Sequence, residues 1–312
     1  MLFFKQTIRY GTYFFVFSII IFWVISKLPG NAADILLEMQ ASPENRAVLL
    51  RQLGLDIPFF ERYIRWFYNF LLGDWGLSYV TQSSVSSLIG SKILISLFLA
   101  TYAMILTVLI AIPVAIKASL NAQNFRGHLI QVSTSLALSI PSFWLGLLLI
   151  TFFAFVWPVF PSSANISYQD GFFQILFKMF LPAFALAIPQ SAALSKILYT
   201  SLMITKRQNY VLVAKSKGLT DQQIFYRHQL KNALIPTIEN LGLQFSFLFV
   251  GAIIIENLFL IPGIGRQLLS SVRERDVPVI MAILTVLFAI TLILQFLCAT
   301  INNFIDRRTV NR

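Results

Sequence analysis

Charged residues are scarce in this chain. Of its 312 residues only 12% are charged, while 57% are hydrophobic. A soluble domain is usually about 25% charged and about 45–50% apolar. A chain with so few polar side chains cannot cover its surface in water. The composition therefore excludes an ordinary soluble protein and predicts an integral membrane protein.

Cysteine and nucleotide-binding motifs are also lacking. Cys298 is the single cysteine, so neither an intrachain disulfide nor a cysteine metal cluster can form. The sequence has no Gly-x-x-x-x-Gly-Lys-Ser/Thr run to hold the phosphates of ATP. No spacing of His, Cys and Asp indicates a metal site, and no serine has a suitable His/Asp pair. We therefore expect no catalytic residue, no cofactor and no metal in this chain.

Six apolar segments are long enough to cross a bilayer, which takes about 20 residues. They lie at 10–27, 93–116, 129–157, 179–200, 237–260 and 279–303. The third is long enough to tilt or to extend past the membrane. Pro182 and Pro189 interrupt the fourth, which a span tolerates when neighbouring groups satisfy the freed carbonyls. The predicted fold class is an all-α membrane protein with about six transmembrane helices.

The first segment has an alternative interpretation. Lys5 and Arg9 precede it and the small residues 31–33 follow it, as in a cleaved signal peptide. Its apolar stretch is longer than the hydrophobic region of a usual signal peptide, which favours an uncleaved helix.

The net charge of +11 predicts the orientation of the chain. A basic balance can indicate nucleic acid, but membrane proteins collect Lys and Arg in their cytoplasmic loops. When both termini are assigned to the cytoplasm, the whole positive excess falls on that side. We therefore predict cytoplasmic termini and contact with membrane lipid, and we expect no nucleic acid partner.

The predicted spans contain few ionisable residues. Lys196, Glu239 and Glu256 are expected near helix ends. An ion-coupled carrier usually keeps charged groups at mid-membrane, and a channel needs a filter or a charged ring. We infer that a partner supplies the energy for transport. A self-sufficient ion-coupled secondary carrier is the alternative.

The longest predicted cytoplasmic segment has clear helix signals. Residues 209–217 indicate a helix that Gly218 ends as a left-handed cap. Thr220 to Gln223 has the pattern of a capping box that starts a second helix, running to about Asn232. Pro236 is expected to mark the start of the fifth span. From the residues alone, these helices either dock on a protein or lie on anionic lipid.

This segment resembles the "EAA" loop of bacterial ABC importer permeases, over Asn209–Leu219 and on to Pro236. In that family the loop forms a coupling helix that sits in a groove of the ATPase. The residues that match its glycine, second alanine and terminal proline are Gly218, Ala214 and Pro236. Leu212 and Val213 replace its acidic residue and first alanine, as is usual in the peptide branch.

Other segments resemble the dipeptide/oligopeptide/nickel permease family in the same order along nearly the whole chain. They are Leu53–Pro58, Gly73–Ser78, Ser139–Gly146, Glu256–Phe259, Pro262–Arg266 and Arg275–Pro278. The long first outer loop is similar to that of the first permease subunit of the pair. Lys196 and Asn209 stand where the family commonly has arginine and aspartate.

The resemblance implies a type I importer fold in the bacterial cytoplasmic (inner) membrane. The implied partners are a second homologous permease, two ATPases that hold ATP and Mg, and an extracytoplasmic substrate-binding protein. The implied regions are a transmembrane helix at 1–28, an extracytoplasmic loop region at 29–92 and a core permease domain at 93–312. The core includes a cytoplasmic coupling loop at 201–236.

The resemblance also implies two sets of site residues. Those expected to couple to the ATPase are Tyr210, Ala214, Lys215, Gly218, Leu219, Arg227, His228, Asn232 and Pro236. Those expected in the outer loops or gate are Asp56, Gly73, Asp74, Gly76, Glu256, Pro262, Gly263, Gly265 and Asp276. Gly263 and Gly265 are expected to form a turn.

The cargo stays open at this point. Short peptides come first, followed by nickel or metal chelates, haem and antimicrobial peptides. Use of the same fold for export or sensing is a further alternative.

Overall fold

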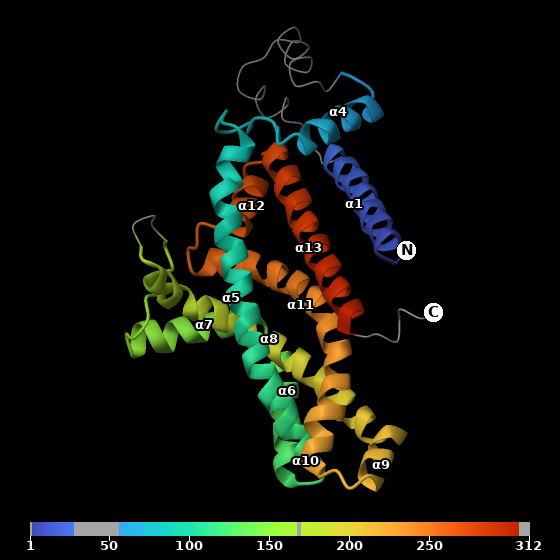
Figure 1. The fold of residues 1–312 in the computed structure, drawn as a ribbon. Coiled ribbons are helices and arrows are strands. Elements are labelled where there is room, and N and C mark those ends of the chain that lie inside the picture. The colour runs from blue at the N-terminus through green and yellow to red at the C-terminus, as the bar shows by residue number, and fades with distance from the viewer. Residues whose placement is uncertain (1, 28–55, 167–169, 306–312) are drawn as a thin grey trace. The chain divides into compact units, whose positions relative to one another are not determined.

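A computed structural model describes residues 2–27, 56–166 and 170–305 (Figure 1). Over these residues the chain is helical apart from turns and one isolated bridge between Leu77 and Ser84. Five helices in the described part are long and apolar enough to cross a membrane, or up to six when a bent pair counts as one span. The predicted all-helical architecture is confirmed.

The spanning helices extend beyond the predicted apolar segments. They are α1 (Leu2–Ser26), α5 (Val85–Leu120), α8 (Phe172–Lys206), α11 (Lys231–Leu258) and α13 (Val277–Ile305). Pro182 and Pro189 lie inside α8, which stays unbroken, as the sequence predicts.

The third predicted span is broken rather than tilted. It consists of α6 (Phe125–Ser139), α7 (Ser142–Ile150) and the π-helical turn η1 (Thr151–Val156). The chain bends by 94° between α6 and α7. Pro141 has no backbone N–H to donate and disfavours helical geometry in Ile140, whose φ and ψ are −85° and 119°. The prediction of one long helix was wrong because it overlooked this proline.

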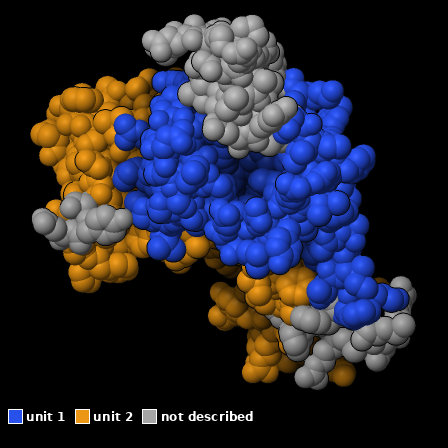
Figure 2. Space-filling model, turned by 90° about the horizontal axis from the view of Figure 1, so that it is seen from above, with its two compact units in different colours: residues 1–95, 262–292 blue, residues 96–261, 293–312 orange. Residues whose placement is uncertain are grey.

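The chain divides into two compact units, coloured separately in Figure 2. Unit 1 comprises residues 1–95 and 262–292, and unit 2 comprises 96–261 and 293–312. In unit 2, α8 packs against α6, α7 and α11. Gly146 of α7 permits a close approach to α11, since a Cβ there would lie 3.0 Å from Leu258 Cδ2 and 3.1 Å from Ile255 Cδ1.

Unit 1 contains two helices in segments predicted as outer loops. α4 (Phe59–Leu71) precedes α5, which begins at Val85 rather than near residue 93. α12 (Ile264–Arg273) lies between α11 and α13 in the sequence. Both helices are too short and too polar on one side to resemble spans, so a search for apolar runs passes over them.

Candidate coupling site and outer turn

The predicted coupling helix is α9 (Asn209–Ser216), which follows the end of α8. Its inner face carries Val211 and Ala214, which form a buried cluster with Ile224. Tyr210 and Leu219 are partly buried against the same cluster. α9 is therefore fixed to the helix that follows it by a small apolar core of its own.

Gly218 ends α9 in the left-handed conformation that the sequence predicts, with φ of +79°. The Leu219 N–H donates to the Ala214 carbonyl at 3.3 Å, and the Gly218 N–H donates to the Lys215 carbonyl at 2.9 Å. These are the two hydrogen bonds of a Schellman cap. A Cβ at Gly218 would meet no atom within 4 Å, so the need for glycine is conformational rather than steric.

The predicted capping box is present at the start of α10 (Asp221–Ile224). The Gln223 N–H donates to Thr220 Oγ1 at 3.3 Å, and Gln223 Oε1 accepts from the Thr220 N–H at 3.1 Å. α10 does not end near Asn232 as predicted. It continues through the π-helical turn η2 (Phe225–Leu230) directly into α11.

Pro236 lies inside α11 and does not mark its start, so that prediction was wrong. Proline removes the backbone hydrogen bond to the carbonyl of Asn232, four residues earlier, and α11 continues through this position. Two nearby side chains bond to other carbonyls of the helix. Thr237 Oγ1 donates to the Ala233 carbonyl at 3.1 Å, and Asn240 Nδ2 donates to the Pro236 carbonyl at 2.9 Å.

Phe225 connects η2 to the spanning helices. Its buried ring shares a cluster with Ala115 of α5, Leu198 and Leu202 of α8, and Ala233 of α11. η2 is therefore in direct contact with three long helices. A sequence search had no signal for this residue, because its partners are far away along the chain.

Three polar residues expected to couple lie on or beside η2. Arg227 is exposed and His228 is half-buried. Asn232 Nδ2 donates to the His228 carbonyl at 2.7 Å. A π-helical turn lacks the regular i−4 backbone hydrogen bonds, and the Asn232 side chain supplies a bond to one of its carbonyls. Such turns are often found at functional sites.

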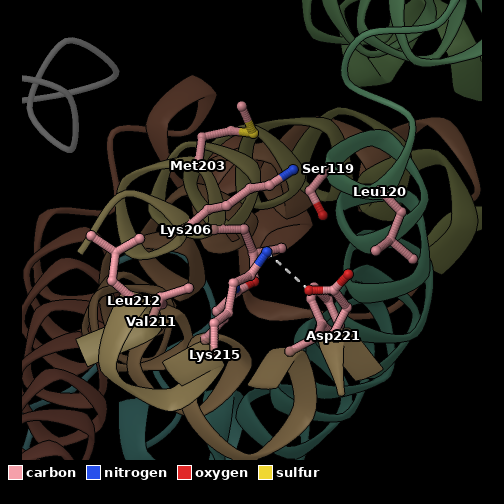
Figure 3. Close-up of a pocket in the computed structure, with 11 residues that line it drawn as sticks. Ser119, Leu120, Met203, Lys206, Val211, Leu212, Lys215 and Asp221 are labelled. Atoms are coloured by element: carbon pink, nitrogen blue, oxygen red, sulfur yellow. Dashed lines mark ion pairs between the residues drawn. The ribbon is translucent and has the colours of Figure 1, made fainter. Parts of the chain in front are cut away.

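A pocket of about 420 Å³ lies among α9, η2 and the ends of α5 and α8 (Figure 3). It is lined by Ser119, Leu120, Leu202, Met203, Lys206, Val211, Leu212, Lys215, Asp221, Phe225 and Gln229. Lys215 Nζ pairs with Asp221 Oδ1 at 3.1 Å, across the loop that Gly218 turns. Both side chains are more than half exposed, so this ion pair adds little stability. Apart from Lys215, sequence reasoning did not select these residues.

The outward face of α9 is apolar. Leu212 is 63% exposed and Val213 is 53% exposed, and Tyr226 of η2 is 55% exposed. Leu212 and Val213 are the positions at which the "EAA" pattern departs from its usual acidic residue and alanine. Exposed apolar side chains on a structured turn between spans are typical of a surface that contacts another protein.

In unit 1, three predicted outer residues build the turn that follows α4. Gly73 and Gly76 have φ of +85° and +84°, which explains glycine at both positions. Asp74 Oδ1 accepts from the Gly76 N–H at 3.1 Å, and the Asp74 N–H donates to the Asn69 carbonyl at 3.0 Å.

Asp276, also predicted, fixes the next part of this turn. Its carboxylate is buried and accepts from the Ser78 hydroxyl and, at 3.1 Å, from the Tyr79 N–H. Burial raises the pKa of the Tyr79 phenol, and the Asp276 charge raises it further, against a smaller lowering by Arg62. We name residues 72–84 with Asp276 the outer turn.

The other residues predicted for the outer loops or gate lie outside the outer turn. Gly263 is the N-cap of α12 and Gly265 lies in its first turn, so the pair does not form the predicted turn. Pro262 precedes them, and Asp56 is exposed at the start of a described segment. The outer turn, built around Asp74 and Asp276, does not include these residues.

Glu256 belongs to unit 2, near the end of α11. It is fully buried and accepts a hydrogen bond from the hydroxyl of Ser96 in α5. Lys196 and Glu239 lie inside α8 and α11 rather than near helix ends, which corrects the prediction for both. Among the described residues, no group of three His, Cys, Asp or Glu side chains could hold a metal ion.

Comparisons with known proteins place this geometry in context. Residues 108–311 match the family model described as binding-protein-dependent transport system inner membrane component. The oligopeptide transport system permease protein AppB of Bacillus subtilis is 29% identical over 91% of this chain and 90% of its own. The glutathione transport system permease protein GsiC of Escherichia coli is 30% identical over 92% of this chain and 93% of its own.

A solved structure has the same fold. The crystal structure of an amino acid ABC transporter with histidines aligns with a TM-score of 0.54 and 16% identity. The alignment covers 70% of this chain and 94% of the other.

Proposed function

Because this chain belongs to the family of binding-protein-dependent transport system inner membrane components, we propose that it is one half of an importer for short peptides. Membership confirms the predicted permease fold, the family resemblance and the multi-pass location in the inner membrane. The chain is a transport component and not itself an enzyme, and it works with a binding protein and an ATPase.

Peptides are the cargo that the relatives favour. The relatives include an oligopeptide permease, a peptide permease of Brucella abortus named as putative (30% identical over 93% of this chain and 90% of its own) and a glutathione permease. Glutathione is itself a tripeptide, so these names share one chemical class. Nickel, metal chelates and haem have no support among these names.

The coupling role rests on one observation, the exposed apolar face of α9 on a segment that also reaches the spanning helices. Leu212 and Val213 face outward, while Phe225 packs against α5, α8 and α11. A partner that pushes on α9 would therefore move three helices at once. We assign the ATPase to this face, one copy here and a second on a homologous permease that completes the pathway.

Import requires the outer side to meet the binding protein. The outer turn supplies a surface held by Asp276, and the charge distribution assigns it to the extracytoplasmic side. Substrate would then pass between the two permeases, and neither the outer turn nor α9 needs to bind it directly.

The docking assignment is tested by copurification of the complex from membranes. Leu212→Asp with Val213→Asp places two charges on the exposed face of α9 without touching its buried face. We expect at least about a tenfold loss of bound ATPase, the equivalent of 1.4 kcal/mol, at an unchanged amount of inserted permease. Gln222→Asp is the matched control, because it adds a carboxylate to exposed α10 and removes no apolar contact.

Each part of the proposal has its own contradicting result. Normal ATPase binding by the double variant would show that α9 is not the docking site. Gly218→Pro and Ala214→Arg should abolish transport while the protein still inserts. Normal uptake by either variant would also show that α9 is not the coupling helix. Mass spectrometry of the ligand released from the copurified binding protein identifies the cargo. A metal chelate or haem in place of a peptide would overturn the substrate assignment.

A further inference from the structure

α4 in unit 1 has three different faces. The inner face packs on α1 through Phe59, Tyr63, Trp66 and Phe67. The polar face carries Glu61, Arg62, Arg65 and Asn69. Between them lies a third face that is apolar and exposed, consisting of Phe60 (73%), Ile64 (63%), Tyr68 (63%) and Leu71 (62%).

The third face is a regular feature of the helix. Residues 60, 64 and 68 repeat at intervals of four, and 71 follows at three, so their side chains lie on one side of α4. Leu72, just after the helix, is 68% exposed and extends the apolar surface. A helix that only closed a loop in water would place polar residues here.

The contacts with α1 fix the level of α4 along that span. Tyr63 OH lies 2.8 Å from Ser18 Oγ, and the Tyr63 ring is 5.5 Å from the Phe22 ring. At 1.5 Å per residue, Ser18 and Phe22 are about 12 Å and about 6 Å below the end of α1 at Ser26. Phe67 of α4 reaches further down, to Phe14 and Phe15, so α4 lies beside the C-terminal half of a candidate membrane span and not beyond its end.

The sides of α1 that α4 does not cover are also apolar and open. Only 22% of the apolar window of α1 is buried. Ile20, Trp23 and Val24 in its last turns are each about half exposed. These residues point away from the side of α1 that Ser18 and Phe22 turn toward α4, so α1 has apolar surface that α4 does not cover.

We propose that α4 is an interfacial anchor whose Phe60–Ile64–Tyr68–Leu71 face is buried in the lipid leaflet at the C-terminal end of α1. Interfacial helices place their apolar face about 5–10 Å into the boundary between headgroups and acyl chains, with charged residues turned toward water. Seven of the thirteen residues of α4 are aromatic, and aromatic side chains are enriched at this level. Arg65 pairs with Glu61 at 2.5 Å on the polar face, which is exposed and can meet phospholipid phosphates, and we commit to the membrane surface as the partner.

The test uses the full transporter complex in phospholipid vesicles, with Cys298→Ser removing the single native cysteine. Phe60→Cys and Ile64→Cys carry an environment-sensitive fluorophore on the apolar face. Glu61→Cys and Arg65→Cys are matched controls one residue away on the polar face of the same helix. All four side chains are exposed, so these exchanges leave the packing on α1 intact.

Quenching by lipids with a spin label high on the acyl chain should be roughly threefold stronger at 60 and 64 than at 61 and 65. Aqueous iodide should show the opposite order. Equal access of iodide to all four positions would overturn the proposal. Protection of 60 and 64 from both quenchers would also overturn it, because the second permease would then cover the face. The same holds if adding the binding protein removes the lipid quenching.

Discussion

Two residues in the candidate sites show how a torsion angle or a pair of atoms defines a position. Gly218 is needed for its φ of +79°, since nothing crowds its Cβ. Asp276 is needed for its two carboxylate oxygens, each of which accepts one hydrogen bond. The two positions therefore tolerate different substitutions, although the resemblance to the permease family includes both residues.

Gly218 should tolerate asparagine better than valine. A β-branched residue in the left-handed region costs about 1–2 kcal/mol, whereas asparagine visits this region readily. We expect Gly218→Val to speed amide exchange over residues 209–224 and Gly218→Asn to leave it nearly unchanged. Hydrogen-exchange mass spectrometry of the complex measures both. Equal protection in the two variants would show that the cap is not held by this conformation.

Asp276→Ala should loosen the outer turn. It removes two hydrogen bonds to a charged acceptor, each worth about 1.5–3 kcal/mol, and leaves the Tyr79 N–H without its acceptor. Limited proteolysis should cut residues 72–84 several-fold faster than in the parent protein. Thr81→Ala is the control, because its hydroxyl makes only an exposed hydrogen bond to Ser83. Cleavage unchanged by Asp276→Ala would mean that the turn is held by other contacts.

At the level of the element, the sequence predicts local features well and long-range packing poorly. The Gly218 cap and the Thr220 capping box depend on a few adjacent residues, and both are present as predicted. Pro236 was wrongly expected to start a span, because packing keeps α11 helical through it. The helix break at Pro141 was not predicted, because the residues around it are apolar. α4 carries too little continuous apolar sequence to be detected by hydropathy.

Phe225 offers a direct test of the packing that no local pattern predicts. Replacing a buried phenylalanine by alanine costs about 3–5 kcal/mol, so Phe225→Ala should lower the thermal stability of the complex and uncouple ATP hydrolysis from uptake. Tyr226→Ala removes an adjacent ring that is 55% exposed and should change stability little. If both variants melt alike, Phe225 is not the link between η2 and the spans.

Gly146 tests the approach of α7 to α11 in unit 2. A valine there would place its Cβ 3.0 Å from Leu258 Cδ2 and 3.1 Å from Ile255 Cδ1, an overpacking that typically costs about 1–3 kcal/mol. Thermal unfolding of the complex should show a clear loss for Gly146→Val. Gly90→Ala is the control, because a Cβ at Gly90 meets nothing within 4 Å and alanine favours the helix. An equal effect of the two changes would argue against a close helix contact at Gly146.

For the whole molecule, composition, charge and fold agree on a membrane component that takes its energy from elsewhere. The low charge content predicted the bilayer, and the chain lacks a phosphate-binding loop. The inference of an external energy source survives the correction at Lys196, because the family itself works with an ATPase.

The predicted orientation is the last property to test, and it depends only on the distribution of charge. In a Cys298→Ser background, Thr81→Cys places a thiol on the exposed outer turn and Lys217→Cys places one at the end of α9. Since Lys and Arg mark the cytoplasmic side, a membrane-impermeant maleimide added to intact spheroplasts should label position 81 and not 217. Both positions should react after the cells are opened, which controls for access. Labelling of 217 alone in intact spheroplasts would invert the topology and would place α9 out of reach of any cytoplasmic ATPase.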